Sequence, residues 1–153
     1  MTFLNLLLGL PVMLLCLVAE VASLFWCVRY YVLRSARDPQ GQRLLSAIGP
    51  LLVSMLVMLV IDLVQIAFWA ALFMLLGEFE HAYDAMYHSA VNFSSLGYGD
   101  IVMSHDRRLL GPLEAVNGVL MLGMTAAALM AIVQHMITSQ RDAILAAGRG
   151  DRA

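Results

Sequence analysis

The sequence contains no lysine, so all nine of its positive side chains are arginines, against eleven acidic residues. Charged residues make up only 13% of the 153 residues, whereas soluble domains carry about 25%. So few charges cannot cover a water-facing surface, which argues against a soluble enzyme, a disordered regulator and a basic nucleic-acid-binding protein. Hydrophobic residues make up 61% of the chain, and this composition predicts an integral membrane protein.

Cysteine is also scarce, since the chain contains only Cys16 and Cys27. On a helix these two residues would lie roughly 16 Å apart, which is too far for a disulfide. They therefore give no indication of the redox compartment.

Three hydrophobic stretches are long enough to cross a bilayer, which takes about 20 apolar residues in a helix. They lie at residues 2–28, 48–76 and 109–137. We therefore expect an all-α membrane protein, divided into an N-terminal transmembrane helix (1–34), a linker (35–47), a central module (48–137) and a short tail (138–153). The first stretch lacks a basic leader and is too long for a signal peptide, so we expect a retained helix.

The distribution of arginine predicts the orientation. Seven arginines flank the linker or lie in the tail, and only Arg107 and Arg108 lie between the second and third stretches. By the positive-inside rule the linker and C-terminus are cytoplasmic, and the N-terminus lies outside the cell (inner) membrane. The acidic segment 77–110 then faces outward and attracts cations, although a simple solvated loop is the alternative.

This outer segment contains about three turns of expected helix, too short to span, followed by a glycine-punctuated stretch. Non-helical backbone is tolerated at membrane depth only where protein buries it or water lines it. Gly97 and Gly99 allow dihedral angles that let successive carbonyls point the same way. We therefore expect a re-entrant helix and a row of oxygens for a dehydrated cation, with the Ser95 hydroxyl at its inner end. The stretch reads Ser94-Ser95-Leu96-Gly97-Tyr98-Gly99-Asp100.

These residues resemble the Thr-Thr-Val-Gly-Tyr-Gly-Asp signature of potassium channels. Residues 48–137 are similar to the two-helix pore module of prokaryotic potassium channels, with an extra N-terminal helix. The resemblance implies an outer helix, a pore helix at 84–93 and an inner helix. One chain supplies one filter strand, so several copies are needed to close a ring, and the family implies a homotetramer that conducts potassium passively and is no enzyme.

The resemblance also implies roles for individual residues and no catalytic ones. Potassium, the permeant ion, would bind at Ser95, Leu96, Gly97 and Tyr98, and Gly99 completes the filter. Ser94 and Asp100 would support it. Gly118 is the candidate gating hinge, and Leu122, Ala126 and Met130 are candidates for lining the cavity or gate. No organic cofactor, nucleic acid or soluble substrate is expected, and the partners are the lipid bilayer and further copies of the chain.

Three positions depart from the family pattern. Serine replaces threonine at Ser95, leucine replaces valine at Leu96, and Val91 stands where many relatives place a glutamate that bonds the filter aspartate. A weakly selective monovalent cation channel is therefore an alternative. A non-conducting channel-like subunit is a second one, against which the intact Gly97-Tyr98-Gly99-Asp100 argues.

Several polar residues have no role in this picture. Asp62, near the middle of the second stretch, is expected either to sense ions or protons, to tie helices together, or to be a protonated acid bonded to a polar neighbour. Glu20 is expected nearer the cytoplasmic interface. Three histidines lie in the outer segment, where they would either modulate the pore with pH, bind a blocking metal, or be ordinary loop or pore-helix residues: His81, His88 and His105. The first stretch has no arginine ladder, so we do not expect a voltage sensor, and the gating stimulus is not indicated.

Overall fold

The computed structural model describes residues 2–35 and 44–150, which form four helices. Helices α1 (Thr2–Ser35), α2 (Leu44–Leu75) and α4 (Leu110–Gly150) are long and apolar enough to cross a membrane, over Phe3–Arg34, Ile48–Leu75 and Leu110–Arg141. Helix α3 (Ala82–Phe93) is much shorter. The predicted all-α fold with three spanning helices and one short additional helix is confirmed.

The helix boundaries differ from the expected ones by a few residues, except at the C-terminus. Helix α2 begins at Leu44, so the last residues of the expected linker belong to its first turn, and α3 begins two residues earlier than expected. Helix α4 continues far beyond the apolar stretch, to Gly150. Glutamine, arginine and alanine favour helix in water as well as in lipid, so hydropathy does not mark this end. Residues 36–43 of the predicted linker lie outside the described residues.

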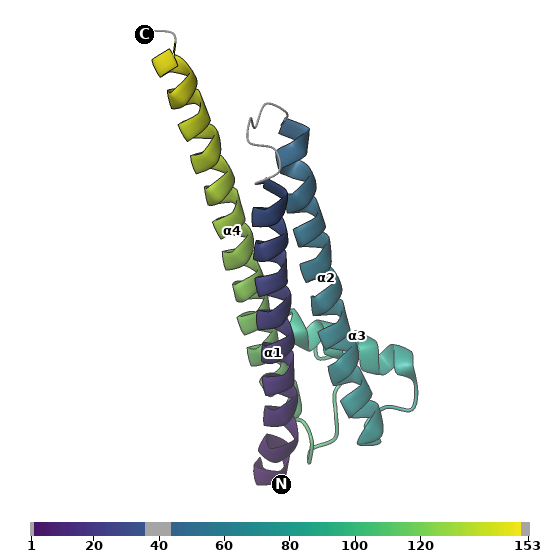
Figure 1. Ribbon diagram of the computed structural model, residues 1–153. Coiled ribbons are helices and arrows are strands. Elements are labelled where there is room, and N and C mark those ends of the chain that lie inside the picture. The colour runs from purple at the N-terminus through teal and green to yellow at the C-terminus, as the bar shows by residue number, and fades with distance from the viewer. Residues whose placement is uncertain (1, 36–43, 151–153) are drawn as a thin grey trace.

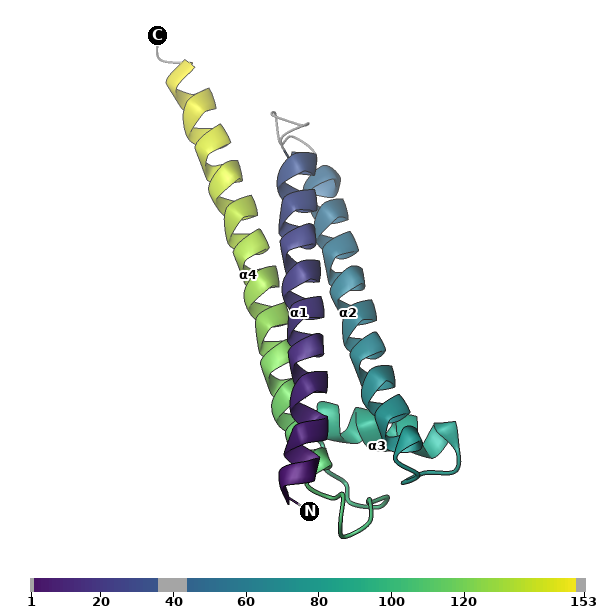
Figure 2. The same cartoon turned by 60° about the horizontal axis from the view of Figure 1, so that its bottom comes forward.

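The three long helices run side by side, and α3 lies across one end of the bundle (Figures 1 and 2). Helix α1 packs against α2 and α4, and α3 also packs against α2 and α4, but the backbones of α1 and α3 do not approach each other. Helices α2 and α4 thus separate α1 from α3.

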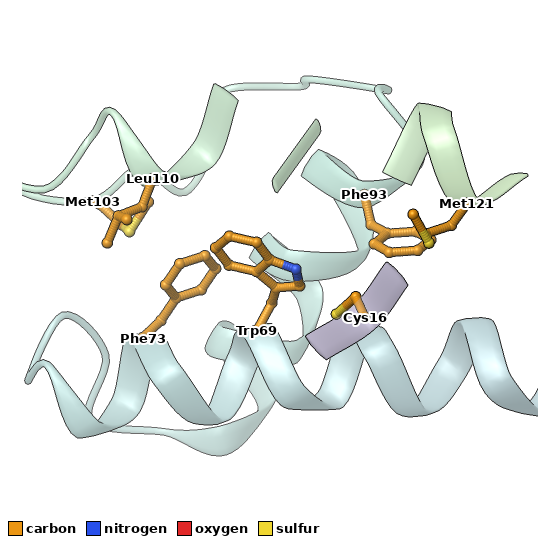
Figure 3. Close-up of a cluster of buried hydrophobic side chains, with 7 residues drawn as sticks. All are labelled: Cys16, Trp69, Phe73, Phe93, Met103, Leu110 and Met121. Atoms are coloured by element: carbon orange, nitrogen blue, oxygen red, sulfur yellow. The ribbon is translucent and has the colours of Figure 1, made fainter. Parts of the chain in front are cut away.

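A buried cluster holds the four helices together around the end of α3 (Figure 3). Trp69 and Phe73 from α2 stack at a tilt, with 5.9 Å between their ring centroids, and Phe93 closes the end of α3. Close van der Waals packing of these large side chains fixes the position from which the glycine-punctuated stretch departs. The cluster comprises Cys16, Trp69, Phe73, Phe93, Met103, Leu110 and Met121.

Candidate functional site

The glycine-punctuated stretch turns back on the end of α3. The backbone amides of Ser95 and Leu96 donate to the carbonyls of Asn92 and Val91, at 2.8 and 2.9 Å, and the Gly97 amide lies 3.3 Å from the Val91 carbonyl. The N–H and C=O of one planar peptide unit point in opposite directions. The carbonyls of these peptide units therefore point away from α3.

The backbone of the stretch alternates in handedness. Ser95, Gly97 and Gly99 have positive φ angles of 59°, 61° and 72°, whereas the intervening Leu96 and Tyr98 do not. Such alternation gathers successive amides on one side of the chain and so gathers the carbonyls on the other. Glycine adopts positive φ easily, but a non-glycine residue such as Ser95 does so at a cost of about 1–3 kcal/mol.

The carbonyls of this stretch are free to bind another group. Among the described residues, none donates a hydrogen bond to the carbonyls of residues 95–99. Leu96 and Tyr98 are 54% and 66% exposed. Unpaired backbone acceptors beside large exposed apolar side chains indicate a surface that is completed by something else, and a row of oxygens is suited to a hard cation.

The two predicted support residues both bond to α3. Ser94 Oγ donates to the carbonyl of Ala90 at 2.7 Å, and Asp100 Oδ2 accepts from the hydroxyl of Tyr87 at 2.7 Å. The Asp100 carboxylate raises the pKa of Tyr87 to about 12, and the phenol lowers the pKa of Asp100. The sequence analysis did not identify Tyr87, although a phenol on the short helix was the available signal. Tyr87 bonds Asp100 to α3, which the apolar side chain of Val91 cannot do.

A second missed pair lies behind α3. The Ser89 hydroxyl lies 2.7 Å from the carbonyl of Ile66 on α2 and also contacts the carboxyl of Glu114 on α4. Ser89 and Glu114 are both fully buried. A serine in the short helix and an acid at the start of the last helix were visible in the sequence, but nothing there indicated that they meet.

Gly118 lies against the end of α3. A Cβ atom added at Gly118 would lie 1.9 Å from the carbonyl oxygen of Phe93, so only glycine permits this approach of α4 to α3. The hinge role of Gly118 stays a prediction, and the structure gives this glycine a packing role as well.

The predicted cavity-lining residues lie on one face of α4. Leu122, Ala126 and Met130 follow each other at intervals of four residues, which places them on one side of a helix, and all three are exposed in the single chain. The structure thus leaves this face open.

The intramembrane acids are arranged differently from expectation. Glu20 was expected to reach the membrane interface, but it is fully buried, and its carboxylate accepts from Gln65 Nε2 at 3.0 Å and Thr125 Oγ1 at 2.9 Å. The expectation was wrong because α1 continues to Ser35, which places Glu20 in the middle of the helix. Asp62 is buried as well, and its Oδ1 has no hydrogen-bond partner among the described residues.

Comparison with known proteins identifies the family. A family model described as "Ion channel" matches residues 55–135, which run from α2 through α3 and the glycine-punctuated stretch into α4. Searches of curated proteins and of solved structures found no match. Helix α1 lies outside the matched residues.

Proposed function

Because the chain belongs to this ion-channel family, we propose that it forms a homotetrameric, potassium-selective channel. The observation that carries the proposal is the row of unpaired carbonyls at residues 95–99, with alternating backbone handedness. Four such rows around an axis would replace the water shell of a potassium ion. The exposed Leu96 and Tyr98 side chains would then be covered by neighbouring copies.

The ion would cross passively, without any catalytic group. The carbonyls of Ser95, Leu96, Gly97 and Tyr98 would hold successive dehydrated ions, with Gly99 at the outer end and the Ser95 hydroxyl at the inner end. The C-terminus of α3 lies next to Ser95, so its partial negative charge would favour a cation there. The open face of α4, with Leu122, Ala126 and Met130, would line the cavity, and apolar side chains there could gate by dewetting.

The direct test is a reversal potential under bi-ionic conditions. Purified protein in planar bilayers, with potassium on one side and sodium on the other, should give a reversal potential far from zero and a current that barium blocks. A value near zero would contradict potassium selectivity and favour a weakly selective cation channel. No current under any condition would favour a non-conducting subunit.

Two glycine variants make this test specific to the filter. Gly77 and Gly99 have nearly equal positive φ angles of 75° and 72°, and a Cβ at either position would meet no atom within 4 Å. Gly77→Ala and Gly99→Ala therefore introduce similar backbone strain. We expect Gly99→Ala to abolish selective conduction and Gly77→Ala to conduct like the wild type. Equal effects of the two variants would contradict the assignment of residues 95–99 as the filter.

A further inference from the structure

His88 lies inside the protein, directly behind the glycine-punctuated stretch. It is on α3 and only 6% exposed. The rings of Phe73 and Phe79 pack against its imidazole, with centroid distances of 5.6 and 5.1 Å. These contacts fix the plane of the imidazole ring and thereby the directions of its two nitrogens.

Both ring nitrogens of His88 have hydrogen-bond partners. Nδ1 lies 2.8 Å from the carbonyl oxygen of Ile101, and Nε2 lies 2.8 Å from the side-chain nitrogen of Asn92. A carbonyl can only accept and an amide nitrogen can only donate. His88 must therefore carry its proton on Nδ1 and leave Nε2 as an acceptor, which is the neutral form.

The Asn92 side chain is enclosed on its other side. It lies beside the buried carboxyl of Glu114. A Cβ at Gly111, in the first turn of α4, would lie 3.2 Å from Asn92 Nδ2, so the backbone of α4 closes this side.

These bonds connect the outer end of the filter to the rest of the protein. Ile101 directly follows Asp100, so the bond from His88 holds the chain where it leaves the stretch. Asn92 lies one turn further along α3 and joins His88 to the start of α4. The position of Ile101 thus depends on how the imidazole ring of His88 is held.

On the basis of the proposed channel function, we propose that neutral His88 is a positioning residue for the filter, and that its protonation from the filter side reduces conduction. A second proton on Nε2 would point at the hydrogens of the Asn92 amide. Two donors cannot bond to each other, so Asn92 would have to move, and the way in which His88 is held behind the stretch would change with it.

The groups around His88 determine the pH at which His88 becomes protonated. Burial lowers the pKa of His88 below its ordinary value, while the Ile101 carbonyl and the charge of Asp100 oppose this shift. Glu114 on α4 lies beyond Asn92, and the α2 ring that packs against His88 is the apolar ring of Phe73. Because the shift is downward, the neutral form persists at neutral pH, and the response is expected below about pH 6.5.

The neighbouring hydrogen-bonded pair, Tyr87 and Asp100, does not titrate in mildly acidic solution. The pKa of Tyr87 is raised to about 12 and that of Asp100 is lowered from its ordinary value. The bond between Tyr87 and Asp100 therefore persists through mildly acidic solution. A change of current between about pH 7.5 and 5 reports on a histidine rather than on this pair.

The test is the pH profile of the potassium current, with the pH varied on the filter side alone. Wild-type current should fall several-fold and reversibly in acid. In His88→Gln, which keeps a donor and an acceptor but does not titrate, the profile should be flat. His81→Gln and His105→Gln are matched controls, since both histidines are exposed, and their profiles should stay like that of the wild type.

A fourth variant distinguishes a positioning role of His88 from a general effect of replacing this residue. Asn92→Asp places an acceptor opposite Nε2, so it should favour the protonated ring and move the acid response to higher pH. A flat wild-type profile, or an acid response that survives in His88→Gln, would overturn the proposal.

A measurement that needs no current distinguishes a failure of the channel proposal from a failure of the proposed role of His88. The thermal stability of the detergent-solubilised protein should fall in acid more steeply for the wild type than for His88→Gln, because the folded state disfavours the second proton. If no current is found but the wild type and His88→Gln still differ in their acid stability, the channel function is contradicted and the role of His88 is not. Equal stability profiles contradict the role of His88.

Discussion

At the scale of single residues, the contact between Gly118 and Phe93 decides how closely α4 approaches the end of α3. The buried glycine lets the helix backbone pass the Phe93 carbonyl without a side chain between them. The carbonyl belongs to Phe93, the last residue of α3, and Ser94 is the first residue of the glycine-punctuated stretch. Any displacement at this contact therefore reaches the stretch directly through the backbone.

Gly118→Ala should destabilise the protein, because the added methyl would overlap a backbone atom that cannot rotate away. Overpacking of this kind costs about 1–3 kcal/mol or more. The melting temperature of the detergent-solubilised protein is the measurement. Gly123→Ala is the matched control, since nothing lies within 4 Å of a Cβ there, and alanine should stabilise the helix by up to about 1 kcal/mol. A Gly118→Ala variant with unchanged stability and altered opening would indicate a hinge without a packing role.

At this scale the sequence predicted the backbone pattern of residues 95–99 but not the side chains that hold this stretch in place. The spacing of Gly97 and Gly99 was enough to expect unusual dihedrals, and the structure has them. The partners Tyr87 and His88 were not assigned, because the path by which the chain returns after Asp100 decides which side chains of α3 it meets. No local pattern encodes that path.

At the scale of elements, α1 is bonded to both pore-module helices through the Glu20 cluster, which consists of Glu20, Gln65 and Thr125. Thr125 lies two turns after Gly118 on α4, and Gln65 lies on α2. A carboxylate with two donors from two other helices can hold their relative positions at membrane depth. Movement of α4 past α1 would break the bond to Thr125.

Thr125→Val should weaken this attachment while keeping the size of the side chain. Hydrogen bonds between membrane helices contribute about 0.6–1.7 kcal/mol, so the free energy of unfolding should fall by about that amount. Unfolding in mixed micelles measures it. Thr138→Val is the control, because the Thr138 hydroxyl donates only within its own helix, to Gln134. Equal losses for the two variants, or additive effects of Thr125→Val and Glu20→Gln, would contradict a bond between helices.

Hydropathy was sufficient to find these helices, because a spanning helix requires little more than a long apolar stretch. It could not place Glu20, since the side on which a polar residue finds donors depends on how the helices pack. It also could not find the end of α4, because the helix leaves the apolar stretch without a proline or glycine to stop it until Gly148.

At the scale of the whole molecule, the single chain leaves backbone acceptors and apolar side chains uncovered. The carbonyls of residues 95–99 lack donors among the described residues, and the exposed residues Leu96, Tyr98 and Met130 lie in the glycine-punctuated stretch or on the open face of α4. Exposed apolar side chains can face lipid, but unpaired backbone groups cannot. A cyclic assembly would cover both the unpaired carbonyls and the exposed side chains, since each copy offers the same surface to the symmetry axis.

Native mass spectrometry of the protein released from detergent should therefore give a complex of four copies of the 16.8 kDa chain. Potassium in the buffer should favour the tetramer over smaller species, since ions held between four chains bind only the assembled form. Gly99→Ala should lose this dependence on potassium, whereas Gly77→Ala should keep it. A monomer at all protein concentrations would contradict the assembly.

The length of α4 has a mechanical consequence. From Gly118 to its end at Gly150 the helix runs for about 48 Å at 1.5 Å per residue. With Phe93 as a fulcrum, the far part of α4 is a lever arm. A tilt of a few degrees at Gly118 sweeps the tip of α4 at Gly150 through several ångströms, so a weak pull on that tip would exert leverage on the end of α3.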